Sequence, residues 1–282
     1  MTETGTHVPP MPITPAPDER ARRRFLYRPE GIWTVRIVTF VLLIGFWEWW
    51  AQDVSRALFA PPSEVLAAFY ELVFVQGAIH GALIESLITL VLGLGLCLVI
   101  GIPVGLAMGR SRTLEWGLDP YVTFLYVLPS VAFVPLLVVW LGFDLQMRVA
   151  LVVISGVFPM IINTMVGVKH VDPEFVDGGR AFTATPWQIM LTIIVPATLP
   201  FMFAGLRIAF SAAWVGVIVA EMTALITGIG GLILHYANLF RTANVLVPIL
   251  FIMAVGVFIQ WFSASLQRRM TPWHVERYDA GA

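Results

Sequence analysis

One polar interruption between two long apolar segments decides how this chain is organised: residues 169–200, KHVDPEFVDGGRAFTATPWQIMLTIIVPATLP. Asp172-Pro173-Glu174 is typical of a helix start, because Asp is a favoured N-cap and Pro fits the first helical turn. A second start follows at Thr185-Pro186-Trp187-Gln188, which matches the Ser/Thr-x-x-Glu/Gln capping box. The stretch therefore predicts a short helix at 173–184, a break, and a helix that runs back into apolar sequence. Such an arrangement presents a shaped surface to a partner.

Two adjacent glycines, Gly178 and Gly179, lie inside the first of these predicted helices. A glycine costs a helix about 1 kcal/mol relative to alanine, so the pair needs a physical reason. The reason we infer is the close approach of another backbone or of a bulky side chain. The flanking Asp177 and Arg180 offer polar anchoring to the same partner.

Composition places the chain in a membrane. Of 282 residues, 58% are hydrophobic and only 12% are charged, about half the share found in soluble domains. Several apolar runs approach the ~20 residues that a spanning helix needs. The single Cys97 lies in one of these runs, which excludes a disulfide framework. The five histidines have no ligand spacing, and no metal site is expected.

A catalytic role finds no support in the sequence. The one lysine, Lys169, follows Val168 and precedes His170, whereas a phosphate-binding loop needs Gly-Lys-Ser/Thr. We therefore expect neither a bound ATP nor another cofactor on this polypeptide, and no catalytic residue.

Six membrane spans are predicted, at about 34–51, 84–108, 121–141, 148–168, 199–220 and 245–266. Residues 58–75 are too polar at their start to span and are predicted to begin a helix near Ser63 and to lie at the outer interface. The predicted regions are a basic disordered tail (1–33), the first span with its outer loop (34–58), an interfacial segment (59–79), a permease core (80–266, with the polar interruption at 169–198) and a C-terminal tail (267–282).

Orientation follows from the basic residues. With the N-terminus inside, the outer segments hold only Arg56, Arg148 and Arg241, while the great majority of the other basic residues lie on inner segments. This positive-inside bias predicts that both termini and the polar interruption lie in the cytoplasm. The cluster at 20–24 is interpreted as part of that signal rather than as a nucleic-acid patch, and no nucleic acid is expected as a partner.

Prolines and polar groups within the spans are the candidates for a transport pathway. Proline can free backbone carbonyls that line a cavity, although a kink that only aids packing is the alternative. The pathway and gate candidates are Pro129, Ser130, Pro135, Pro159, Asn163 and Glu221.

Each charged group near or within the spans has a structural interpretation or a functional one. Glu221 either lines the pathway or braces a gate loop. Glu48 either snorkels to the outer interface or has a function. Arg207 is expected to form a structural pair between helices rather than to touch the solute, and Glu85 is expected to favour the N-terminus of its own helix.

The polar interruption resembles the cytoplasmic coupling loop, the EAA motif, of binding-protein-dependent ABC importer permeases. The motif reads Glu-Ala-Ala, three residues, Gly, nine residues, and Ile-x-Leu-Pro. Asp177-Gly178-Gly179 correspond to its first three residues and Ile193-Ile194-Val195-Pro196 to its last four. Thr183 departs from the motif, because the family usually has Gly there, and the form of the turn after the helix is left open.

Further segments resemble the nitrate/sulfonate/taurine branch of this family, from about 59 to 266. They include Ala60-Pro61-Pro62-Ser63, Leu128-Pro129-Ser130, Phe158-Pro159 with Asn163, Gly205-Leu206-Arg207 and Gly228-Ile229-Gly230-Gly231-Leu232. Each is weak alone, but their order and spacing are specific.

The resemblance implies an all-α membrane protein, the transmembrane domain of a type I ABC importer in the inner membrane. It implies two ATP-binding subunits on the cytoplasmic face, an extracytoplasmic solute-binding protein and a second permease copy, as a homodimer in the bilayer. The implied solute is small and anionic, and ATP is bound and hydrolysed by the partner subunits. The implied ATPase-coupling residues are Glu174, Asp177, Gly178, Gly179, Arg180, Ala181 and Pro196.

An ATP-independent secondary transporter or channel is the alternative. It leads one to expect inverted repeats and ionisable residues at mid-membrane; no repeat is seen, and few charges lie at mid-depth. A membrane scaffold without transport activity is a third reading, but it does not explain the broken helices.

Overall fold

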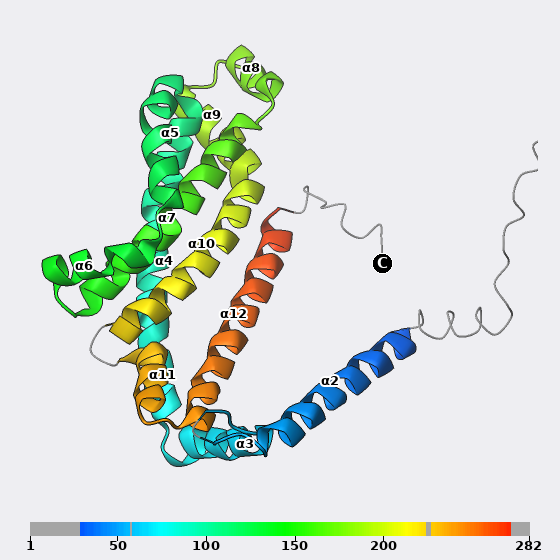
Figure 1. Ribbon diagram of the computed structural model, residues 1–282. Helices are drawn as coiled ribbons and strands as arrows, with labels where there is room; N and C mark the ends of the chain where they lie inside the picture. Colours follow the sequence, from blue (N-terminus) through cyan, green and yellow to red (C-terminus); the bar gives the residue numbers. More distant parts are fainter. Residues whose placement is uncertain (1–28, 57, 224–226, 272–282) are drawn as a thin grey trace, which may run out of the picture.

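The computed structural model describes residues 29–56, 58–223 and 227–271, and these residues are helical with short connections. In chain order the elements are α2 (Pro29–Ala51), α3 (Pro62–Tyr70), the π-helical turn η1 (Glu71–Val75), α4 (Ala78–Arg110), α5 (Arg112–Val127), the 3₁₀ turn η2 (Ser130–Phe133), α6 (Val134–Leu141), α7 (Leu145–Lys169), α8 (Pro173–Ala181), α9 (Pro186–Ile189), the π-helical turn η3 (Met190–Ile194), α10 (Val195–Thr223), α11 (Gly228–Asn238) and α12 (Thr242–Met270). Helix α8 lies at one end of the bundle, and α3 and α11 lie at the other (Figure 1).

Five helical stretches within the described residues are long and apolar enough to cross a membrane: Ile32–Ala51, Ala78–Arg110, Leu145–Lys169, Pro186–Thr223 and Thr242–Met270. The third predicted span, 121–141, is broken. Helices α5 and α6 meet at 91° around Leu128 and Pro129, because proline forces the preceding residue out of the helical region. Leu128 accordingly has extended backbone angles of φ −68° and ψ 130°.

Helix boundaries extend beyond several predicted ones. Helix α2 begins before the predicted residue 34, and α12 continues past 266. Most of the predicted N-terminal tail (1–28), with its basic cluster, and residues 272–282 of the C-terminal tail lie outside the described residues. The helix predicted to begin near Ser63 is confirmed as α3.

Pro159 lies within a continuous helix and not at a break. Helix α7 is continuous from Leu145 to Lys169, and Pro159 is buried within it. Proline removes one backbone hydrogen bond, but α4 and α10 both pack extensively on α7 and hold it in place. Pro135 lies in the first turn of α6. Backbone N–H groups there have no partner within the helix, so proline costs no hydrogen bond at this position.

The core of the bundle is a close contact between α4 and α7. Small residues of α4 recur every fourth position and face residues of α7 with the same spacing, so the two backbones approach closely. The α4 positions are Gly93, Cys97, Gly101, Gly105 and Gly109, and the facing α7 positions are Val152, Gly156, Met160, Thr164 and Val168. Cys97 is a buried free thiol within this ridge.

Helix α2 diverges from the bundle (Figure 1). Most of its described side chains are exposed, including Phe40, Leu42 and Leu43. Its C-terminal end is attached to the chain that follows, where the indole of Trp47 donates to the carbonyl of Ala60 at 3.2 Å.

Candidate functional site

Helix α8 forms the first half of the polar interruption. Its N-terminus is capped as predicted, because the Asp172 carboxylate accepts a hydrogen bond of 2.9 Å from the backbone N–H of Glu174. The helix ends at Ala181 rather than at the predicted 184. Glu174, Asp177, Arg180 and Ala181 are all exposed on it. The four residues therefore share one short, accessible helix.

The turn after α8 has the form that a glycine normally provides. The N–H of Ala184 donates to the carbonyl of Gly179 at 3.0 Å, and the N–H of Thr183 donates to that of Arg180 at 2.9 Å. This pair of bonds is a Schellman motif, in which the residue directly after the helix C-cap adopts the left-handed conformation. Thr183 occupies that position with φ +60°. The chain thus keeps the turn and accepts the strain of a β-branched residue there, about 1–2 kcal/mol.

The second helix start is confirmed as a capping box. The backbone N–H of Thr185 donates to Gln188 Oε1 at 2.7 Å, and the N–H of Gln188 donates to Thr185 Oγ1 at 3.3 Å. Helix α9 then passes through η3 directly into α10. Pro196 is half-buried in the first turn of α10, so it belongs to the returning helix and not to the exposed helix α8.

Gly178 and Gly179 differ in their surroundings. A Cβ on Gly179 would lie 2.9 Å from Ile193 Cδ1 and 3.3 Å from Ile189 Cγ1, whereas a Cβ on Gly178 would meet nothing within 4 Å. Gly179 therefore lets α8 pack on α9 and η3 of its own chain. Gly178 alone leaves an open face for another molecule.

Three exposed aromatic side chains accompany α8 and were not recognised as functional from the sequence. Phe175, Phe182 and Trp187 are 66%, 88% and 69% exposed. Large apolar side chains that protrude from a polar, capped segment mark an interaction surface. The signal was present in the sequence, because a polar interruption of two membrane spans has no need of three aromatic residues.

The ion pair on α8 is a weak one. Arg180 Nη1 lies 2.9 Å from Asp177 Oδ1, and both side chains are more than half exposed. An exposed pair of this kind contributes little to stability, so both groups remain free to exchange partners.

The predicted pathway residues fall into separate places. Pro129, Ser130 and Pro135 lie at the bend between α5 and α6. Pro159 and Asn163 lie in α7, where Asn163 Nδ2 donates to the Pro159 carbonyl at 2.8 Å. The structure therefore does not join all the candidates into one site.

Glu221 braces the start of α11. It is fully buried, and its Oε2 accepts hydrogen bonds of 2.9 Å from both Ser86 Oγ and the Gly230 N–H. Ser86 Oγ in turn accepts from the Ile229 N–H at 3.0 Å. This geometry agrees with the bracing interpretation of Glu221.

Glu85 completes the brace, which corrects its predicted role. Helix α4 begins at Ala78, so Glu85 does not lie in its first turn. Its Oε2 instead accepts a hydrogen bond of 2.8 Å from the N–H of Gly228. The first three N–H groups of α11, which have no partner inside a helix, are thereby bound by side chains from α4 and α10.

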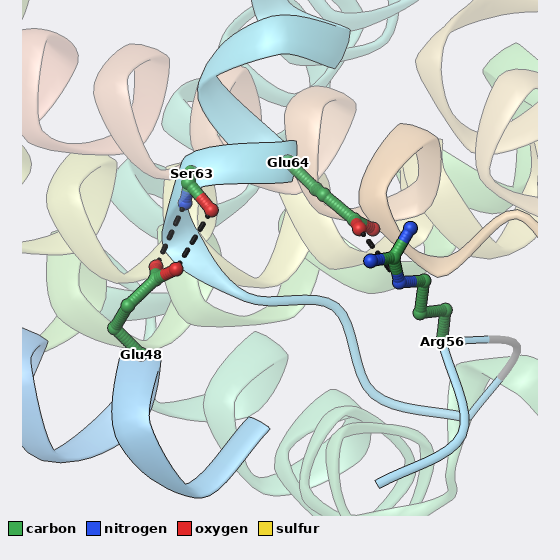
Figure 2. A network of polar contacts seen from close by, with 4 residues as sticks. All are labelled: Glu48, Arg56, Ser63 and Glu64. Atoms are coloured by element: carbon green, nitrogen blue, oxygen red, sulfur yellow. Dashed lines mark hydrogen bonds and ion pairs between the residues drawn. The ribbon is translucent and has the colours of Figure 1, made fainter. Parts of the chain in front are cut away.

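Glu48 fixes the junction between α2 and α3 (Figure 2). Its Oε1 accepts from Ser63 Oγ at 2.8 Å and its Oε2 from the Ser63 N–H at 3.1 Å. Arg56 and Glu64 form a second contact across the same junction, with Nε 3.1 Å from Oε1. Glu48 therefore has a specific partner in α3, which the sequence did not indicate.

Comparison with known proteins places the chain among transport proteins. The family described as binding-protein-dependent transport system inner membrane component matches residues 98–272. The taurine transport system permease protein TauC of Escherichia coli (strain K12) is 30% identical over 86% of this chain and 90% of its own. The putative aliphatic sulfonates transport permease protein SsuC of Bacillus subtilis (strain 168) is 28% identical over 92% and 94%. A bicarbonate transport system permease protein, CmpB of Synechocystis sp. (strain ATCC 27184 / PCC 6803 / Kazusa), is 28% identical over 79% and 78%.

Solved structures show the same fold. A chain of the MetNI methionine ABC transporter in an inward-facing conformation matches with a TM-score of 0.62 and 18% identity, over 68% of this chain and 96% of that one. A chain of an amino acid ABC transporter matches with a TM-score of 0.55 and 15% identity, over 73% and 98%. The chain therefore belongs to the binding-protein-dependent transport system inner membrane components and is a multi-pass permease subunit of an ATP-binding cassette importer.

Proposed function

We propose that this permease imports a small anion that carries a sulfonate or carboxylate-like group. The proposal is supported by the relatives, which are named for taurine, aliphatic sulfonates and bicarbonate. The three solutes share a compact oxyanion head group. An extracytoplasmic binding protein would deliver the anion to the outer face, and the permease itself would bind no cofactor.

Helix α8 is proposed to dock on an ATP-binding subunit in the cytoplasm, with both termini of the chain on the same side. The observation that carries this proposal is the exposed aromatic group on a capped helix, above all Phe182 at 88% exposure. Beside it, Gly178 meets nothing within 4 Å, which leaves room for a partner's side chain. Asp177 and Arg180 would anchor the contact through charged hydrogen bonds.

The local structure of α8 suits it to transmit movement. Its packing through Gly179 on Ile189 and Ile193 joins α8 to the helix that leads into α10. The capping box at Thr185 fixes the connection between the two. A displacement of α8 would therefore be passed to α10 rather than absorbed in a flexible loop.

A pair of such subunits is the proposed working unit. Two permease copies would present two α8 helices to two ATP-binding subunits, and ATP-driven closure of those subunits would bring the helices together. Hydrolysis and release would then reset the pathway. This chain would contribute positioning and movement, and the partner subunits would contribute the chemistry.

The test is the co-purification of the cognate ATP-binding subunit with wild type and with Gly178→Arg. A matched control is Gly117→Arg, since Gly117 of α5 also meets nothing within 4 Å and lies outside α8. We expect Gly178→Arg to lower both the co-purified ATPase and solute uptake about tenfold or more, with membrane insertion unchanged. Full binding and uptake in Gly178→Arg would refute the docking site.

A further inference from the structure

Arg207 is a cation within a membrane helix, and no described residue forms an ion pair with it. It lies about 18 Å along the axis of α10 from Val195. Its Nη2 donates to Gln267 Oε1 of α12 at 2.7 Å, and its Nε is buried without a hydrogen-bond partner among the described residues. In the described parts of the chain, no Asp or Glu forms an ion pair with it.

A charge at this position has to be compensated. Ionisable side chains inside a membrane pair with one another or face a water-filled cavity, because an isolated charge there is costly. Gln267 is neutral and accepts from only one of the five N–H groups of the guanidinium. The inter-helix pair expected from the sequence is therefore present, but neither Gln267 nor any other residue that the structure describes supplies a negative charge to it.

The neighbouring surface is polar as well. Ser211 lies one turn further along α10 and is exposed, and its Oγ accepts a hydrogen bond of 2.9 Å from Nε2 of Gln260 on α12. Exposed polar side chains at membrane depth face water or protein rather than lipid. Arg207, Ser211 and Gln260 thus form a polar row along the α10–α12 face.

The backbone holds this row in a fixed position. Gly205, two residues before Arg207, packs so closely on α7 that a Cβ there would lie 2.8 Å from Asn163 Cβ. On the other side, the indole of Trp214 donates to the Ile252 carbonyl of α12 at 3.2 Å. Helix α10 is therefore fixed to α7 and to α12 on either side of the guanidinium.

We infer that Arg207 binds the anionic head group of the solute as it crosses the membrane, with Ser211 and Gln260 as the adjacent neutral hydrogen-bonding groups. The inference rests on the proposed import of an anion. The planar guanidinium fork matches the paired oxygens of a sulfonate or a carboxylate. The solute would supply the counter-charge that no described residue provides, and it would leave again because Arg207, Ser211 and Gln260 include no permanent anion.

The experiment uses the complete transporter in proteoliposomes, with its ATP-binding subunits and binding protein, and radiolabelled taurine and bicarbonate as probes. The variants are Arg207→Gln, which removes the charge, Arg207→Lys, which retains it, and Gln267→Leu, which removes only the inter-helix hydrogen bond. Arg269→Gln is the control, because it removes a positive charge from an exposed position on α12.

Arg207→Gln is expected to lower the maximal uptake rate about 10- to 100-fold, as the loss of a charged hydrogen bond implies. ATP hydrolysis without solute should stay at the wild-type rate. Arg207→Lys should recover part of the uptake, and Gln267→Leu and Arg269→Gln should transport as wild type does.

Two results would overturn the inference. Wild-type uptake in Arg207→Gln would show that the charge is not needed. Equal losses in Arg207→Gln and Gln267→Leu, with reduced assembly, would assign Arg207 to helix packing alone. If wild-type proteoliposomes take up neither probe, the proposed anion import fails instead, which is a separate outcome.

Discussion

The contact between α4 and α7 predicts opposite effects for the same substitution at two glycines of one helix. A Cβ on Gly105 would lie 2.6 Å from Thr164 Cβ and 2.7 Å from the backbone carbonyl oxygen of Ile161. A Cβ on Gly95 would meet nothing within 4 Å. Gly105→Ala and Gly95→Ala therefore restrict the backbone of the unfolded chain to the same extent, but only Gly105→Ala adds a methyl group to a close contact.

The magnitudes follow from these distances. Overpacking of a close contact costs about 1–3 kcal/mol, and here a backbone oxygen would have to move. Alanine gains about 0.4–1 kcal/mol over glycine by restricting the unfolded chain. The net expectation is a loss of about 1–2 kcal/mol in Gly105→Ala and a gain of up to about 1 kcal/mol in Gly95→Ala.

The assay is unfolding of the purified permease in mild detergent by added SDS, followed through tryptophan fluorescence. Both variants and wild type are compared at one protein and lipid concentration. If Gly105→Ala unfolds at the same or a higher SDS fraction than wild type, the close α4–α7 contact is not what stabilises the bundle.

Three further substitutions probe the turn, the brace and the junction. Thr183→Gly should stabilise the turn after α8 by about 1 kcal/mol, because it removes the left-handed strain at φ +60°; slower local hydrogen exchange would report this, and faster exchange would contradict it. Glu221→Leu should destabilise the protein by about 3 kcal/mol or more, since the Gly230 N–H loses its buried acceptor. Glu221→Gln keeps an acceptor and should lose less stability. Equal shifts in the melting temperature of the two variants would argue against the bracing role of Glu221. Glu48→Ala should weaken the start of α3 by about 1 kcal/mol through the lost hydrogen bonds to Ser63. It should also broaden the distribution of spin-label distances between α2 and the bundle. An unchanged distribution would show that Glu48 does not hold α2 to α3.

Local features of the fold could be predicted from the sequence because their determinants are neighbours in the chain. The Asp172 cap and the Thr185 capping box each rely on residues within three positions. The apolar spans follow from composition, and the membrane helices were found near their predicted places. Thr183 stands where the EAA motif usually has Gly, and the same residue adopts the positive φ of the turn.

The remaining features depend on contacts between distant residues. Glu85 and Ser86 bind the start of α11 from 143 positions away, and no local pattern indicates that pairing. Likewise, the sequence could not separate Gly178 from Gly179, since only the packing of α8 decides which one is covered. The angle at Pro129 is a tertiary property, because a proline sets where a helix stops and not where the chain then goes.

The ridge shared by α4 and α7 has a consequence for how the transporter can move. Residues that interlock at every fourth position can change register only by a whole helical turn, about 5.4 Å, and each intermediate position would press side chains into backbone. We therefore expect the two helices to travel as one rigid body. The changes of angle between open and closed states are then expected at places without such a ridge, such as the Leu128–Pro129 bend and the junction before α3. A disulfide engineered between α4 and α7 is accordingly expected to leave import intact, and its blocking of import would show that the two helices slide.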